Sequence, residues 1–182
     1  GRRWCLLALL GSHLGHSAFG CTAIAIDGTA SEDGSAYAGM NADSSNADVR
    51  LAYVPTRSSL TERRAVFTSD LRYPRWVGFG RGETYHPQPG QNLSAPVGHI
   101  PETSGTFGYF EASEPLMNDQ GLGLGESSCS SMLVNRLPDD DTSADEGLPT
   151  GILDTVTLMQ LALERCASAR CAVQLLGVLV EA

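Results

Sequence analysis

One cysteine of this sequence stands where a proteolytic cut would turn it into a reactive N-terminal residue. Cys21 follows Ala18, Phe19 and Gly20, and small residues at positions 18 and 20 are typical of a signal-peptide cleavage site. Cleavage before Cys21 would give it a free α-amine beside its thiol. Such amines have a pKa of about 7.7 to 8, which suits a general base at neutral pH. One residue would then supply nucleophile and base together, as in hydrolases with an N-terminal threonine.

Asp43 is the second candidate, because the chain between it and Cys21 is predicted to form a hairpin. A strand, a turn and a return strand are predicted over residues 21–26, 27–34 and 35–40. Symmetric pairing about the turn places residue 21 opposite residue 40. Asn41 and Asp43 then lie just past the end of the first strand, and two or three residues of strand cover only about 7 to 10 Å. We therefore expect Asp43 to approach the amine of Cys21.

Other catalytic chemistries have little support in the sequence. After residue 20 there are two histidines, His86 and His99, and neither has a partner at metal-ligand spacing. The segment 125–129, "GESSC", lacks the final glycine of a serine-hydrolase elbow. The sequence therefore predicts no metal and no cofactor.

A glycine-rich segment follows the middle of the chain. Residues 121–128, "GLGLGESS", carry glycine at every second position at first, so one face of an extended segment would have no side chains. Such a face either lets a ligand or another backbone approach closely or belongs to a tightly packed strand. We predict that this segment pairs with residues 106–113 in a hairpin joined around residues 117–121.

The first twenty residues are predicted to be a signal peptide or propeptide. Two arginines precede a short apolar run, which is well below the roughly 20 residues that span a bilayer. Asn92 begins an N-glycosylation acceptor triplet, which also fits export. We expect a secreted or endomembrane protein with no membrane span. Both ends look cut, so residues 21–182 are interpreted as the N-terminal part of a larger domain.

Four cysteines remain after that cleavage: Cys21, Cys129, Cys166 and Cys171. They allow two disulfides in three connectivities. A bond between Cys166 and Cys171 requires a break in the helix predicted there. A bond from Cys21 to Cys129 would instead indicate a non-catalytic secreted domain.

Composition and pattern place the chain in the α+β class. The 182 residues have a net charge of −9, and all 12 basic residues are arginines that form no basic stripe, so nucleic-acid binding is not expected. Further strands are predicted over residues 49–55 and 65–69, long loops over 73–103, and helices from Ile152 and from about Ser168. Strands followed by helices indicate α+β architecture.

Two blocks of the sequence resemble a known family. "CTAIAI…ASEDGSAYAGMNAD" and "PLMNDQGLGLGESSC" are similar to the cysteine dipeptidases of the N-terminal nucleophile (Ntn) hydrolase superfamily, the secernin-like group. "DVRLAYVP", "YPRWVGFGRGETY" and the C-terminal helical segment resemble its eukaryotic microbial branch. The resemblance covers nearly all of residues 21–177. It implies an αββα sandwich, activation by exposure of Cys21, and hydrolysis of dipeptide substrates.

The same resemblance implies roles for individual residues. Asp43 would hold the N-terminal amine or the substrate, and Ser127 and Ser128 fall near the oxyanion-binding asparagine of the related acylases. Asn41 and Asn118 complete the candidate substrate-binding set. Those acylases carry Arg-Asn-x-Asp, whereas Met40 takes the place of the arginine here. An Ntn amidohydrolase acting on non-peptide amides is the alternative enzyme.

Overall fold

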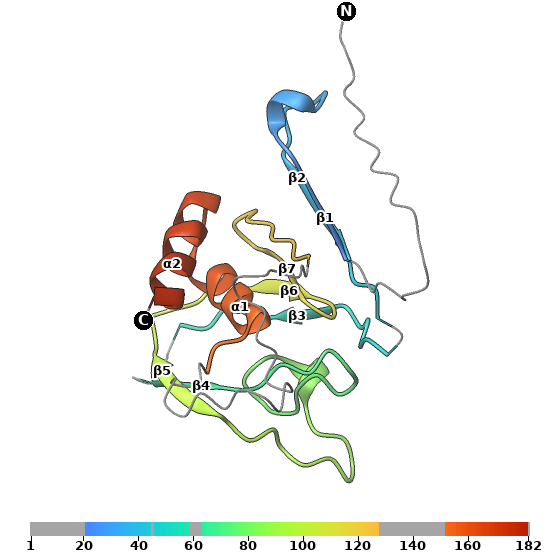
Figure 1. The fold of residues 1–182 in the computed structure, drawn as a ribbon. Helices are drawn as coiled ribbons and strands as arrows, with labels where there is room; N and C mark the ends of the chain where they lie inside the picture. The colour runs from blue at the N-terminus through green and yellow to red at the C-terminus, as the bar shows by residue number, and fades with distance from the viewer. Residues whose placement is uncertain (1–20, 45, 59–62, 128–151, 182) are drawn as a thin grey trace, which may run out of the picture.

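The computed structural model describes residues 21–44, 46–58, 63–127 and 152–181. The described part contains small antiparallel sheets and helices, which confirms the predicted α+β class (Figure 1). The strands are β1 (Thr22–Ile26), β2 (Tyr37–Asn41), β3 (Ala52–Val54), β4 (Arg63–Val66), β5 (Gly98–Pro101), β6 (Tyr109–Glu111) and β7 (Pro115–Asn118). The helices are α1 (Thr155–Arg165) and α2 (Ala169–Glu181), and short 3-10 turns occur at η1 (Gly28–Ala30) and η2 (Glu83–Tyr85).

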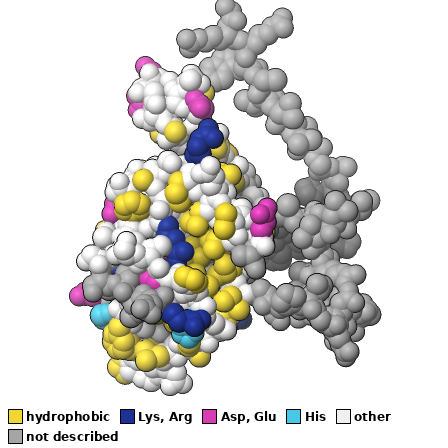
Figure 2. Space-filling view, turned by 90° about the vertical axis from the view of Figure 1, so that its left-hand side faces the viewer, with side chains coloured by type: hydrophobic (Ala, Val, Ile, Leu, Met, Phe, Trp, Pro, Cys, Tyr) yellow, Lys and Arg dark blue, Asp and Glu magenta, His cyan; other side chains and the backbone are white. Residues whose placement is uncertain are grey.

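The core lies between the helices and one face of the sheet in which β6 is flanked by β3 and β7. Alternation along β3 places Ala52 and Val54 in this core, while Tyr53 between them points to the other face. That other face carries a row of apolar side chains, because Tyr53 pairs with Phe110 and Phe110 with Met117. All three are about half exposed. Apolar side chains are also visible on the molecular surface in Figure 2.

The hairpin β1–β2 forms as predicted, but the predicted register is wrong by two residues. Met40 pairs with Ala23 rather than with residue 21. The cause is a longer loop than the turn residues suggested. Asp27 accepts a hydrogen bond from the amide of Thr29 and so starts η1, and Asp33 accepts one from the amide of Ser35. These local bonds keep residues 27–36 out of the ladder.

The second predicted hairpin also pairs different strands from those expected. The partner of β6 is β7, and the turn from Asn118 to Gly121 leads from β7 into the glycine-rich segment. Gly121 has a φ of 79°, which glycine adopts without strain. The glycine-rich segment then makes one bridge back to β7, between Gly123 and Met117. It is therefore an extension beside β7 and not the partner of residues 106–113.

Both predicted helices form, but the one predicted from Ile152 begins only at Thr155, while the one predicted from about Ser168 begins at Ala169. Asp154 caps α1 by accepting a hydrogen bond from the amide of Thr157 at 2.7 Å. α1 ends at Arg165 and α2 begins at Ala169, and this break permits a Cys166–Cys171 disulfide with a Cα–Cα distance of 5.5 Å. Across the described ranges, no helix has both the length and the apolar character needed to cross a membrane.

The region predicted as long loops, residues 73–103, contains one strand that the sequence analysis missed. β5 pairs with β4, with Arg64 opposite Ile100 and Val66 opposite Gly98. A segment of glycine, histidine, isoleucine and proline has little β-propensity of its own, so the pairing comes from tertiary context.

Candidate functional site

Cys21 directly precedes β1 and carries a free, half-buried thiol. Cys129, the suggested disulfide partner of Cys21, lies outside the described residues. A free thiol at the start of a strand is available for nucleophilic chemistry.

Asn41 and Asp43 meet at the end of the hairpin beside this cysteine. The side-chain oxygen of Asn41 accepts a hydrogen bond from the backbone N–H of Thr22 at 2.7 Å. The Asn41 amide group in turn donates to Asp43 Oδ1 at 2.7 Å. The structure therefore connects Asp43 through Asn41 to the residue that follows Cys21. The two-residue register shift makes this possible, because Asn41 now stands directly opposite Thr22.

Ser127 holds the same cysteine from the other side. Its hydroxyl donates to the backbone carbonyl of Cys21 at 2.7 Å, across 106 positions of sequence. Its neighbour Ser128 lies outside the described residues. Cys21 is thus fixed through its carbonyl by Ser127 and through the next amide by Asn41, while the sulfur takes part in neither contact.

The glycine-rich segment brings Ser127 to this place because its bare face lies against the hairpin. A Cβ on Gly123 would stand 3.3 Å from the Cβ of Ala38. One on Gly125 would stand 3.5 Å from the carbonyl oxygen of Gly39. Of the two readings of these glycines, the structure shows close approach to another stretch of backbone.

Asn118 has a structural position. It is buried, and its amide group donates to the carbonyls of Leu163 at 2.8 Å and Cys166 at 2.7 Å. Its oxygen accepts from the amides of Gln120 and Leu122. Two donors and two acceptors are the full capacity of an asparagine side chain, so Asn118 has no hydrogen bond left for a substrate.

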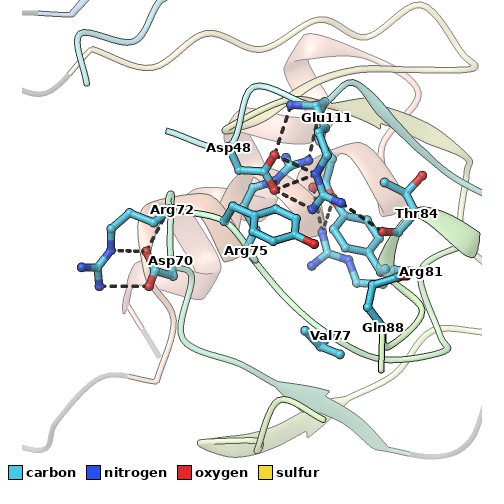
Figure 3. Close-up of polar contacts among 12 residues, drawn as sticks. Asp48, Asp70, Arg72, Arg75, Val77, Arg81, Thr84, Gln88 and Glu111 are labelled. Atoms are coloured by element: carbon cyan, nitrogen blue, oxygen red, sulfur yellow. Dashed lines mark hydrogen bonds and ion pairs between the residues drawn. The ribbon is translucent and has the colours of Figure 1, made fainter. Parts of the chain in front are cut away.

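A second polar assembly, which sequence reasoning missed, is drawn in Figure 3 and includes none of the residues that contact Cys21. Asp48 accepts hydrogen bonds from Arg50 and Arg75, and Glu111 accepts from Arg81 at 2.7 Å and from the Tyr85 hydroxyl. These residues are scattered over 64 positions of loop and strand, so no local sequence motif predicts that they come together. The only local signal is the density of arginines among aromatic residues between positions 72 and 85.

The electrostatics of this assembly are those of buried, paired charges. Hydrogen bonds from Arg50 lower the pKa of Asp48 to about 2, and the nearby Arg75 adds to the effect. Burial raises the pKa of Tyr85 well above its usual value, and the charge of Glu111 raises it further. Tyr85 is therefore a hydrogen-bond donor to Glu111 and not a phenolate.

Among the residues that the structure describes, no group of three or more histidine, cysteine or acidic side chains is placed to hold a metal ion. No family model, curated protein or solved structure matched the chain.

Proposed function

We propose that this chain, once cleaved before Cys21, is a cysteine-type dipeptidase of the Ntn-hydrolase kind, with the αββα sandwich of that superfamily, acting in a secretory or endomembrane compartment. The observation that carries the proposal is the way Cys21 is held. Its thiol is free, and Ser127 and the Asn41–Asp43 pair fix the backbone on both sides of its side chain.

The reaction would proceed through a thioester. The α-amine of the processed Cys21 takes the thiol proton, and the sulfur attacks the carbonyl carbon of the dipeptide to give a tetrahedral oxyanion. The C–N bond then breaks, and the leaving amine receives the proton from the α-ammonium. Water, deprotonated by the same amine, attacks the thioester and releases the second amino acid, and the cysteine sulfur regains a proton.

The surrounding residues have supporting parts in this scheme. The exposed carboxylate of Asp43 contributes a negative charge at the end of the hairpin, where the ammonium form of the α-amine arises. Asn41 keeps that carboxylate in position. Backbone N–H groups near Cys21 would stabilise the developing oxyanion. The Ser127 hydroxyl has one proton, which it donates to the carbonyl of Cys21, so its part is to position that residue.

The test compares the processed and unprocessed chains. Protein that begins at Cys21, verified by mass spectrometry of its N-terminus, should hydrolyse members of a dipeptide panel, and the chain that retains residues 1–20 should not. Cys21→Ser should lower kcat at least 100-fold, and Cys21→Ala should abolish activity. Full activity in Cys21→Ser, or a natural mature chain that begins elsewhere, would refute the proposal.

The same assay separates the alternative enzyme. Acylated amines and other non-peptide amides belong in the panel, and a preference for them would assign the site to an amidohydrolase. Peptide mapping without reductant gives an independent check, because a Cys21 joined in a disulfide cannot act as the nucleophile.

A further inference from the structure

A large cavity lies among β4, residues 75–85 and α1, and none of the residues that hold Cys21 lines it. Its volume is about 660 Å³, which is within the range of roughly 300 to 1,000 Å³ typical of small-molecule sites. Any ligand bound here would therefore be separate from the thiol chemistry of Cys21.

The walls of this cavity gather positive charge in an acidic protein. Five arginines line it: Arg57, Arg63, Arg64, Arg75 and Arg81. Four carboxylates line it with them: Asp70, Glu102, Glu111 and Glu164. The lining therefore carries one positive charge in excess, although the whole chain has a net charge of −9.

The cations that line the cavity are crowded. Arg64 forms an ion pair with Glu164, yet burial lowers its pKa to about 10. The charges of Arg57 and Arg81 act in the same direction as burial, while those of Tyr109 and Glu102 act against it. Arginines close enough to repel one another in a poorly solvated place favour the entry of an additional negative charge.

One wall of the cavity is apolar. Val66 and Phe67 come from β4 and the residue after it, Trp76 from the following loop and Val156 from α1. Phe67 and Trp76 contact each other edge to face, with ring centroids 5.6 Å apart. A ligand that fits both walls has a charged head and an apolar body.

We propose that this cavity binds a small organic oxyanion, a carboxylate or a phosphate with an aromatic or aliphatic body. The head group lies near Arg57 and Arg81, whose side chains keep 30% and 17% of their surface accessible. The body lies against Phe67 and Val156. This assignment does not depend on the proposed hydrolysis.

Fluorescence of Trp76 provides the test in the 182-residue chain. The protein has two tryptophans, so Trp4→Phe leaves Trp76 as the only reporter, and it lines the cavity. The probes are 3-phenylpropionate, phenyl phosphate, inorganic phosphate and the neutral 3-phenylpropionamide. We expect a saturable change with one or both aromatic anions, with a Kd at least tenfold lower than for the amide. Comparison of the two anions shows which head group the site prefers.

Variants locate the binding. Arg57→Gln should raise Kd about tenfold, the equivalent of about 1.4 kcal/mol. Arg170→Gln removes the same charge from α2 at a position that does not line the cavity, and it should leave Kd unchanged. Should Arg57→Gln fail to fold, phenylglyoxal modification of the unaltered protein serves instead. The bound anion should then protect Arg57 and not Arg170, as read by peptide mapping.

Three results would overturn the proposal. The first is that neither aromatic anion gives a saturable fluorescence change up to about 10 mM. The second is that 3-phenylpropionate and its amide bind with equal affinity. The third is that the variants at Arg57 and Arg170 have equal effects on Kd, or that the anion protects both arginines equally.

Discussion

Asp48 shows at the scale of one residue what buried charge contributes to this fold. Its side chain is 2% exposed and accepts hydrogen bonds from Arg50 and Arg75. Its pKa is lowered from 3.8 to about 2, chiefly by Arg50, so the carboxylate is favoured in the folded state. This stabilises the fold above pH 3.8, and the contribution is lost as the pH falls from 3.8 towards 2.

We therefore expect Asp48→Asn to lower the free energy of unfolding at pH 7 by about 2 kcal/mol. Urea denaturation at pH 7 and at pH 2 measures the effect, which should shrink at the lower pH. Asp70→Asn is the matched control, because the Asp70–Arg72 pair is exposed and should contribute less than about 0.5 kcal/mol. Equal losses in both variants would contradict this account.

We expect substitution of Asn118 to lower the stability of the fold. Asn118→Ala leaves the amides of Gln120 and Leu122 without their acceptor and two carbonyls near the end of α1 without their donor. We expect a loss of about 3 kcal/mol in the free energy of unfolding, measured in urea. The exposed Asn92 is the control, and Asn92→Ala should change stability by less than about 0.5 kcal/mol. A stable Asn118→Ala protein with altered substrate affinity would contradict this and would show that Asn118 contributes to substrate binding.

Sequence reasoning at this scale depended on how local the contacts are. Asn41 follows the return strand of the predicted hairpin, so spacing brought it near the start of β1. Asp43 bonds to Asn41, and its approach to the amine of Cys21 stays a prediction. The contact from Ser127 was expected only through a family resemblance, because it spans most of the described chain. The arginine cavity had only the arginines among aromatic residues at 72–85 as a local signal, since Arg57 and Arg81 come to one cavity only through the fold.

At the scale of elements, α1 depends on its N-cap residue, Asp154. Besides capping the helix, the carboxylate of Asp154 accepts hydrogen bonds from the amide and the hydroxyl of Ser69, at 2.9 and 3.1 Å. The cap therefore also attaches α1 to the segment that follows β4.

Asp154→Ala should reduce the free energy of unfolding by about 2 kcal/mol, because the cap and the bridge are lost together. Asp154→Asn should lose less, since asparagine is an equally good N-cap, although its single acceptor oxygen cannot keep the bond from the Ser69 amide as well. Thermal unfolding of the two variants distinguishes these outcomes. Similar losses in both would mean that the negative charge matters more than the hydrogen bonds.

The elements that sequence predicted best are those with signals at both ends. α1 has an acidic cap, a repeat of apolar residues and an arginine in its last turn. β5 has none of these and forms only because β4 lies beside it. In the β1–β2 hairpin, the strands were visible as alternation, but the register depended on how Asp27 and Asp33 bind their own loop.

At the scale of the whole molecule, the β1–β2 hairpin stands apart from the core (Figure 1). Every residue of β1 is exposed, and in β2 only Met40 is half-buried. The hairpin contacts the rest of the chain through the glycine-rich segment and Ser127. A two-stranded ribbon with so little buried surface should open without unfolding of the core.

Hydrogen exchange measured by mass spectrometry should show this difference. Peptides from residues 22–41 should exchange at least tenfold faster than peptides from residues 109–118, because opening of the hairpin costs less than global unfolding. Gly123→Leu should accelerate the hairpin alone, since a large side chain there meets Ala38. Equal protection of both regions would mean that the hairpin unfolds only with the core.

The contacts that hold Cys21 have a consequence for how the proposed enzyme would be switched on. Ser127 binds the carbonyl of this residue, and Asn41 binds the amide that follows it. Neither contact uses the nitrogen that links Cys21 to Gly20. Cutting that bond would leave both contacts in place and add only a free amine. The precursor would then be a zymogen whose site is already assembled, and its activation would change the chemistry of one atom rather than the shape of the protein.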